Sequence, residues 1–400
     1  MTPPGGGGPF DFLDPYCDLY QGVITDRMFA LAAEGRRRHR TDTGFGAPVV
    51  FHAMGDGNLA CAPGGDAETF APVRTSRSNC VLAPDIEKPR SLVQDFYARA
   101  AETPQEALCC PVSYDSVDTE HIPREVIDRF YGCGGPMSVA QVKPGETVLD
   151  LGSGAGIDVF IAAKKVGPTG RAIGVDMTDP MLGVAGRSRA KVAETLGYDV
   201  VDFRKGFLEE VPAEDRSVDL VTSNCVINLS ADKPRVFAEM WRILKDHGRI
   251  VVSDIVADRT VPPDLKVNVH LWGECISGAL SEDEFLADLE KAGFYGLAVL
   301  KKSFWKEVEG HSFYSVTVRG FKFQKKAGCV YQGHRALYLG PYASVMDEEG
   351  HLFPRGQAIE VCTDTLAKLS HEPYAGAFVL LEPGASVPEA YAVACGAGCC

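Results

Sequence analysis

The chain has 400 residues, 45% of them hydrophobic, and a formal net charge of −14. This length predicts two or three compact units, and the acidic balance excludes a protein built to bind phosphate backbones, which requires a positive surface. No apolar run approaches the roughly 20 residues of a membrane span, so we expect a soluble, globular protein without nucleic-acid or membrane partners.

Residues 1–86 are rich in Gly, Pro and Asp and show little sustained periodicity, which predicts a poorly ordered or loosely docked N-terminal extension. The basic run Arg36–Arg40 is typical of a solvated charged segment. Met1–Phe10 lacks the basic and apolar regions of a signal peptide. Together with 13 cysteines, this indicates a reducing, cytoplasmic compartment and mostly free thiols. Neither Cys-x-x-Cys nor His-Glu-x-x-His occurs, so an ordinary zinc site has no local signature.

Two helices are predicted before the first strand. Leu92–Arg99 has helical character, and Cys109 and Cys110 lie in the segment that interrupts it. His121–Phe130 places Ile122, Val126, Ile127 and Phe130 on one side and reads as a second, amphipathic helix. It leads into the turn Tyr131–Pro136, which contains Cys133.

A glycine-rich turn follows the apolar strand Val148–Leu151 and precedes a helix. The turn, Gly152-Ser153-Gly154-Ala155-Gly156, lets backbone approach a ligand at a helix N-terminus, as in sites for dinucleotides or S-adenosylmethionine. The dinucleotide fingerprint requires its third glycine where Ile157 stands. Asp150, two residues before the first glycine, is instead usual in class I methyltransferases. The turn therefore favours S-adenosylmethionine.

The next strands supply the remaining predicted cofactor residues. Arg171–Val175 ends at Asp176 and Met177, where a carboxylate can accept hydrogen bonds from both ribose hydroxyls. The alternative is that Asp176 caps the next helix. Phe207 and Leu208, after the strand Val200–Lys205, are placed to contact adenine.

Asn224 and Cys225 follow the strand Val218–Ser223, at the edge where open α/β sheets place their ligands. A helix over Lys233–Leu244 and a strand over Arg249–Asp254 complete the alternation. The fold class predicted is α/β, a doubly wound, mostly parallel sheet covered on both faces.

A smaller mixed α+β unit is predicted at the C-terminus. Ser281 and Glu284 form a capping box for a helix running to Lys291. Ser312–Phe323 and Cys329–Tyr338 alternate as antiparallel strands do. We expect a methyltransferase domain over 87–258, a C-terminal domain over 259–385 and a flexible tail over 386–400 with Cys395, Cys399 and Cys400.

Three cysteines occupy loops that can meet at one edge of the sheet: Cys133, Cys225 and Cys275. Soft thiolates beside a methyl donor suit a soft, thiophilic acceptor. Trivalent arsenic bonds three sulfurs in a pyramid and keeps a lone pair that can attack a methyl group in line. The alternative is that these cysteines are buried simply as small hydrophobic residues.

The segments Tyr131–Gly134, Ser223–Leu229 and Leu271–Cys275, with Asp150–Gly156, resemble those of arsenite methyltransferases. The likeness runs from about Leu92 to the terminal cysteine pair and does not cover the first 86 or so residues. It implies that Cys133, Cys225 and Cys275 hold As(III), and that Cys225 and Cys275 suffice once arsenic carries one methyl group.

The resemblance also implies a redox partner for Cys133. An upstream cysteine, Cys110 or Cys109, would form a disulfide with it and return two electrons to arsenic after methylation. An external thiol reductant, of glutathione or thioredoxin type, would reopen the bond. Tyr131 corresponds to a family aromatic beside the methyl path, and Phe130 stands where the family often has a second tyrosine. The implied substrates are arsenite and methylarsenite, the products mono- and dimethylated arsenicals, and we expect a monomer.

Two other functions fit parts of the sequence. A methyltransferase for a small organic molecule would bind no arsenite. A thiol protein that sequesters or senses metalloids would bind arsenite without affinity for a methyl donor, and would leave Asp150, Gly152, Gly154 and Asp176 without a purpose.

Overall fold

The computed structural model describes residues 73–74, 83–84, 90–102, 114–266, 271, 274–326 and 329–388. The predictions for the basic run Arg36–Arg40, for Cys109 and Cys110, and for the tail cysteines fall outside these residues. Within the described part of the chain, no helix has the length and apolar character needed to cross a membrane.

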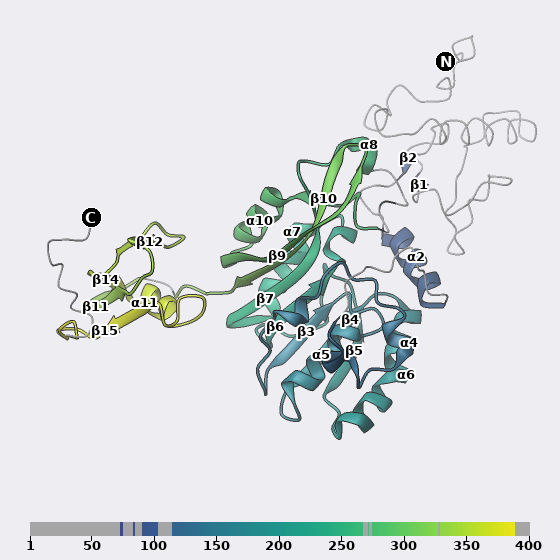
Figure 1. The fold of residues 1–400 in the computed structure, drawn as a ribbon, viewed down its shortest axis with the longest axis horizontal. Helices are drawn as coiled ribbons and strands as arrows, with labels where there is room; N and C mark the ends of the chain where they lie inside the picture. The colour runs from purple at the N-terminus through teal and green to yellow at the C-terminus, as the bar shows by residue number, and fades with distance from the viewer. Residues whose placement is uncertain are drawn as a thin grey trace, which may run out of the picture.

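An eight-stranded, mostly parallel sheet forms the centre of the molecule (Figure 1). Its main path runs in the order β5 (Val201–Lys205), β4 (Arg171–Asp176), β3 (Thr147–Leu151), β6 (Val218–Asn224), β7 (Leu244–Ala257), β10 (His311–Phe321) and β9 (Tyr295–Val308), and β8 (Leu280–Ser281) pairs with the end of β7. The pairs from β5 to β7 are parallel, whereas β10 is antiparallel to both β7 and β9. The predicted doubly wound class is confirmed.

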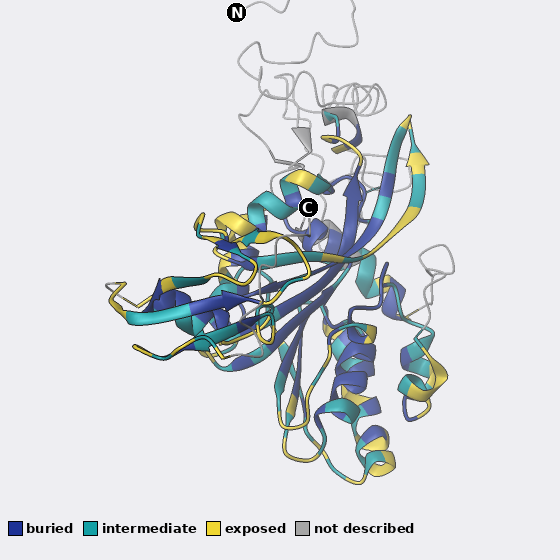
Figure 2. Cartoon of the chain, turned by 60° about the vertical axis from the view of Figure 1, so that its left-hand side comes forward, coloured by how far each residue is buried: buried dark blue, intermediate teal, exposed yellow. Residues whose placement is uncertain are grey.

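Helices cover both faces because neighbouring residues of each strand point to opposite sides. Val148 of β3 packs with α5 (Ile157–Val166) and α6 (Asp179–Leu196). The next residue, Leu149, packs on the other face with α7 (Lys233–Ile243) and α10 (Glu282–Lys291). Figure 2 shows the central strands buried between these layers. The capping box predicted at Ser281 is present, with Glu284 as its partner.

The remaining helices and short elements surround this core. They are the strand pair β1 (Val73–Arg74) and β2 (Ala83–Pro84), helices α2 (Arg90–Glu102), α3 (Ser116–Thr119), α4 (Arg124–Ile127) and α8 (Pro263–Lys266), and the 3₁₀ turns η4 (Pro136–Ser138) and η5 (Ile227–Leu229). The helix predicted over His121–Phe130 is wrong in its extent, because Pro123 caps α4 and the helix ends before Asp128.

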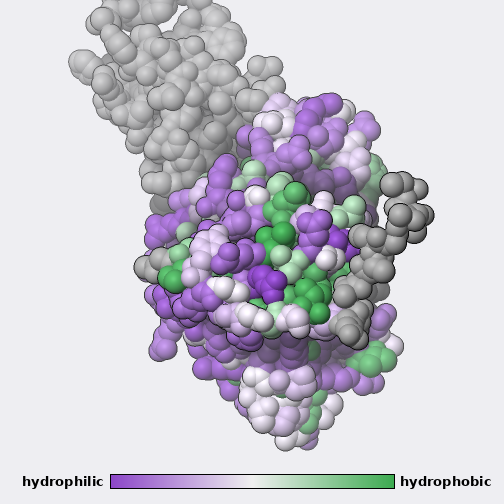
Figure 3. All heavy atoms as spheres, turned by 90° about the vertical axis from the view of Figure 1, so that its left-hand side faces the viewer, coloured by the Kyte–Doolittle hydropathy of each residue, from purple (hydrophilic) through white to green (hydrophobic). Residues whose placement is uncertain are grey.

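A second, smaller unit follows residue 326. It contains a three-stranded sheet of β14 (Ala358–Cys362), β11 (Tyr331–Tyr338) and β15 (Phe378–Leu381), the hairpin β12 (Ser344–Met346) and β13 (Leu352–Pro354), and helix α11 (Thr363–Leu369). A disulfide joins Cys329 to Cys362. Figure 3 looks onto this unit and shows a mainly hydrophilic surface with an apolar group near its middle.

The boundary between the two units differs from the predicted one at residue 259. The strands β9 and β10 extend the large sheet, so that sheet continues to Phe321. The alternating stretch predicted over Ser312–Phe323 is an antiparallel strand, but it pairs with β7 and β9 and not with the strands that follow residue 326.

Candidate active site

The glycine turn after β3 has the backbone geometry that only glycine tolerates well. Gly152, Gly154 and Gly156 have φ values of 69°, 52° and 95°. A Cβ on Gly152 would lie 2.6 Å from a methyl carbon of Val226, and one on Gly156 would lie 2.6 Å from the ring of Phe203. Because these positions have no β-carbon, the backbone of the turn can pack directly against Val226 and Phe203.

A cavity of about 740 Å³ opens above this turn. Nine of the ten predicted cofactor residues line it: Asp150, Gly152, Ser153, Gly154, Asp176, Met177, Phe207, Leu208 and Asn224. The tenth, Gly156, forms the N-cap of α5 and is not part of the wall. Gln94 of α2 and Asp158 of α5 also line the cavity, and no sequence pattern had marked either as a site residue.

The buried carboxylates of Asp150 and Asp158 and the partly buried one of Asp176 give the cavity its electrostatic character. Burial raises the pKa of Asp150 well above its usual range, and Asp158 adds to this effect. Burial likewise raises the pKa of Asp158 to about 6 and raises that of Asp176. Since each acid is costly to ionise without a counter-charge, the cavity favours a ligand that carries positive charge.

Hydrogen bonds fix the three acids in place. Asp150 accepts from the Thr222 hydroxyl at 2.8 Å. Asp176 accepts from the backbone N–H of Gly154 at 2.9 Å and of Thr178 at 2.8 Å. Asp158 accepts from the Tyr114 hydroxyl, a short contact that crosses from the segment before the sheet.

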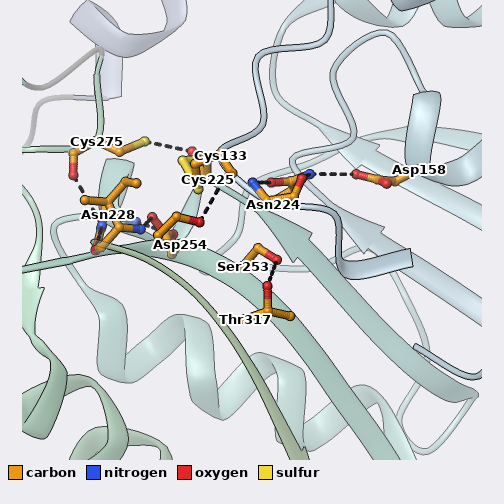
Figure 4. The surroundings of a disulfide bond; sticks show 12 residues. Cys133, Asp158, Asn224, Cys225, Asn228, Ser253, Asp254, Cys275 and Thr317 are labelled. Carbon is orange, nitrogen blue, oxygen red and sulfur yellow. Dashed lines mark hydrogen bonds between the residues drawn. A yellow bond between two sulfur atoms is a disulfide. The ribbon is translucent and has the colours of Figure 1, made fainter. Parts of the chain in front are cut away.

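The three predicted cysteines lie in one buried cluster beside the cavity. Cys133 and Cys225 form a disulfide with a Cα–Cα distance of 5.6 Å. Cys275 is not part of this disulfide, and its thiol donates to the backbone oxygen of Cys225 at 2.8 Å (Figure 4). Cys225 also lines the cavity, so the cluster meets the cofactor space at that residue.

The structure pairs Cys133 with Cys225. The predicted upstream partners of Cys133, Cys109 and Cys110, lie outside the described residues, so that pairing stays a prediction. Two of the three sulfurs that could bind a thiophilic atom are therefore engaged with each other, and both become available only after reduction.

Two of the cysteines have left-handed backbone conformations, with φ of 61° at Cys225 and 62° at Cys275. Such values are uncommon for residues with a β-carbon and persist only where neighbouring contacts hold them. Asn228, which is fully buried, supplies such contacts. Its amide donates to the backbone oxygens of Ile255 at 2.6 Å and Cys275 at 3.3 Å.

The segment around Cys133 is held close to the end of β6. Asn224 donates to the Gly134 oxygen at 2.9 Å and accepts from the Gly134 N–H at 3.1 Å. The same amide donates to Asp158 at 3.2 Å, which links the cavity to the cysteine cluster. Ser315 of β10 donates to the Cys133 backbone oxygen at 2.8 Å.

Tyr131 also lines the cavity, next to Phe130. Its hydroxyl donates to the Ala100 backbone oxygen of α2 at 3.0 Å. The side chain thus joins α2 to the cavity wall.

Comparison with known families covers both units of the chain. Residues 142–293 match the family described as "Methyltransferase domain", and residues 325–398 match a domain of unknown function, DUF8838. The second match includes the C-terminal unit.

The chain is similar to several proteins named arsenite methyltransferase. It is 37% identical to one from Halobacterium salinarum over 54% of this chain and 60% of that protein. It is 32% identical to one from Aquipseudomonas alcaligenes, covering 72% of this chain and 89% of that one, and 32% identical to one from Mus musculus, covering 76% and 86%.

A solved structure agrees with these sequence matches. It is an arsenic(III) S-adenosylmethionine methyltransferase from Chlamydomonas reinhardtii, 33% identical to this chain, with a TM-score of 0.53. The match covers 69% of this chain and 98% of that one.

Proposed function

The chain belongs to the arsenite methyltransferase family, and from this premise we propose that it transfers methyl groups from S-adenosylmethionine to As(III) held by cysteine thiolates, giving mono- and dimethylated arsenicals. The observation that carries the proposal is the buried cluster of Cys133, Cys225 and Cys275 at the wall of the cofactor cavity.

The cavity fits this cofactor. Asp150 and Asp158 line the cavity and would offer carboxylates to the cofactor's ammonium and sulfonium, and Asp176 would accept hydrogen bonds from its ribose hydroxyls. Phe207 and Leu208 offer apolar contacts for an adenine ring. When bound, the cofactor would supply an electrophilic methyl group in the cavity that Cys225 also lines.

Arsenite enters by reacting with three cysteine thiols: three As–S bonds replace the three As–O bonds, and each hydroxyl leaves as water with one thiol proton. The resulting arsenic centre is neutral and retains a lone pair, which the pyramid of sulfurs leaves free on one side. Apolar neighbours of the cluster, including Val93, Leu229 and Phe313, exclude water from it. Transfer requires no acid–base pair because thiolate-bound arsenic has no proton to lose.

Each transfer leaves arsenic formally pentavalent, so two electrons must return before the next one. We propose that closure of a disulfide supplies them, with Cys133 and an upstream cysteine, Cys110 or Cys109, as the pair. The disulfide between Cys133 and Cys225 supports a need for an external thiol reductant, since arsenite can use these sulfurs only after the bond opens. After the first methylation, Cys225 and Cys275 are sufficient to hold methylarsenite.

The test is an assay of the purified, reduced protein with arsenite, S-adenosylmethionine and a thiol reductant. We expect mono- and dimethylated arsenic, and no turnover of any substrate when Cys225 or Cys275 is replaced by serine. Cys133→Ser should abolish methylation of arsenite and retain methylation of methylarsenite. Cys329→Ser in the C-terminal unit is the matched control and should remain active. Full activity of the Cys225 variant would contradict the proposal.

A further inference from the structure

A buried carboxylate lies beside the cysteine cluster, and the proposed function does not yet use it. Asp254, near the end of β7, is 0% exposed. One of its oxygens and the sulfurs of Cys133 and Cys225 all lie within 4.8 Å of one another. Figure 4 shows the three side chains directed toward a common centre. A carboxylate in this position interacts electrostatically with any atom that the two sulfurs bind.

Asp254 is held by backbone donors, and it also interacts electrostatically with the buried ammonium of Lys233. It accepts from the backbone N–H of Ile255 at 2.8 Å and of Asn228 at 3.2 Å. Burial raises the pKa of Asp254 to about 6, and these bonds and the buried ammonium of Lys233 oppose the rise. Because both of these N–H groups donate to its oxygens, the site stabilises the carboxylate form of Asp254 beside the two sulfurs.

Methyl transfer moves positive charge toward this carboxylate. Beforehand, the charge is on the sulfonium of the cofactor and thiolate-bound arsenic is neutral. The arsenic lone pair forms the As–C bond, the C–S bond breaks, and its electron pair stays on the cofactor's sulfur. Arsenic then carries the positive charge. Arsenic bonded to Cys133 and Cys225 would lie next to Asp254, whose oxygen is within 4.8 Å of both sulfurs, whereas the cofactor would occupy the cavity, which Cys225 lines and Asp254 does not.

We propose that Asp254 stabilises the positive charge that develops on arsenic during methyl transfer, an inference that rests on the function proposed above. Because the charge approaches Asp254 only as the reaction proceeds, the carboxylate stabilises the transition state more than the bound substrate. The electron balance is otherwise unchanged, and the thiol reductant still returns the two electrons.

A purely structural role for Asp254 predicts different behaviour. If the side chain served only to hold the Cys225 loop through Asn228, its loss would weaken arsenite binding and lower stability together. A charge-stabilising role lowers the rate of the chemical step while arsenite affinity is retained. The two roles are therefore separated by measuring the rate and the affinity in the same variants.

The experiment uses the reduced, full-length protein loaded with arsenite and mixed with saturating S-adenosylmethionine in a single turnover. We expect Asp254→Asn, which removes the charge but keeps the shape, to slow the first methyl transfer about 10- to 100-fold, with arsenite affinity changed by less than about threefold. Asp254→Ser is a second neutral variant, and either one that folds provides the test. Asp254→Glu, which keeps the charge, should be faster than both.

Asp364→Asn is the matched control, since Asp364 is a buried acid of the C-terminal unit that also accepts from a backbone N–H. Its rate should equal that of the wild type. A neutral Asp254 variant with an unchanged rate, or one whose rate falls only as far as its arsenite binding, overturns the inference. Absence of methylation in the wild type contradicts the proposed function itself, which distinguishes the two failures.

Discussion

Gly132 and Gly134 show how tightly the segment around Cys133 is fitted. A Cβ on Gly132 would lie 2.4 Å from the Asn224 amide nitrogen, and one on Gly134 would lie 2.5 Å from the Ser253 side chain. Because Asn224 also contacts Asp158 at the cavity, any displacement of this segment moves the cysteine cluster relative to the cofactor. The position of Cys133 thus depends on the absence of two β-carbons.

Gly132→Ala should therefore impair the site. We expect arsenite methylation to fall at least about tenfold, because the new methyl group displaces Asn224 or the Cys133 segment. The measurement is kcat with arsenite, together with the melting temperature. Gly186→Ala in α6 is the control, because no heavy atom lies within 4 Å of its added Cβ, and it should keep both values. Equal activity in the two variants would count against the tight fit.

The buried acids of the cavity predict a pH dependence of stability. Asp158 has a pKa raised to about 6 in the folded protein, against 3.8 as its ordinary value. A carboxyl group whose pKa is higher in the folded than in the unfolded protein stabilises the folded state fully at pH values below its unfolded-state pKa. This stabilisation is lost as the pH rises through its folded-state pKa. Without cofactor, the free energy of unfolding of the wild type relative to Asp158→Asn should thus increase by on the order of 2 kcal/mol between pH 7 and pH 4. Urea unfolding at both pH values measures this, and a difference independent of pH would refute it.

At the scale of elements, the regular strands and helices of the parallel sheet were predictable. The strand predicted over Val218–Ser223 and the helix predicted over Lys233–Leu244 agree with β6 and α7 within one residue. Their apolar periodicity is strong and local. The long strand β7 was predicted too short, because its first residues follow α7 directly and its last ones are stabilised by β10.

The capping box at the start of α10 allows a direct test of one predicted element. The Ser281 hydroxyl accepts from the Glu284 N–H, and the Glu284 carboxylate accepts from the Ser281 N–H. Ser281→Ala should lower the free energy of unfolding by about 1 kcal/mol. Asp115→Ala is the control, since Asp115 stands at the N-cap of α3 without a side-chain capping bond and should cost less. Chemical denaturation compares the two, and equal losses would argue against the box.

At the scale of the whole molecule, the extension of the large sheet by β9 and β10 was not predictable. Alternating hydrophobicity predicts that a segment is a strand. The strand with which it pairs depends on contacts between residues far apart in the chain. The C-terminal unit packs on the same end of the sheet. The Tyr295 hydroxyl donates to the Glu372 backbone oxygen at 3.0 Å, and the rings of His247 and His371 stack 3.5 Å apart.

The site was predictable to different degrees. Parallel topology alone places Cys225 at the carboxyl edge of the sheet, beside the glycine turn. Cys133 and Cys275 were assigned to the site because the segments around them resemble those of the family. The hydrogen bonds that hold these segments, from Asn224 and Asn228, could not be predicted from the sequence. The pairing of Cys133 with Cys225 and the proximity of Asp254 depend on three-dimensional arrangement and have no sequence signature.

The central claim is that three sulfurs from separate segments gather around one arsenic atom. X-ray absorption at the arsenic edge, on reduced protein loaded with one equivalent of arsenite, counts the atoms bonded to arsenic. We expect three sulfur neighbours in the wild type, and two sulfurs with one oxygen in Cys275→Ser. Fewer than three sulfurs in the wild type, or an unchanged environment in Cys275→Ser, would contradict the account.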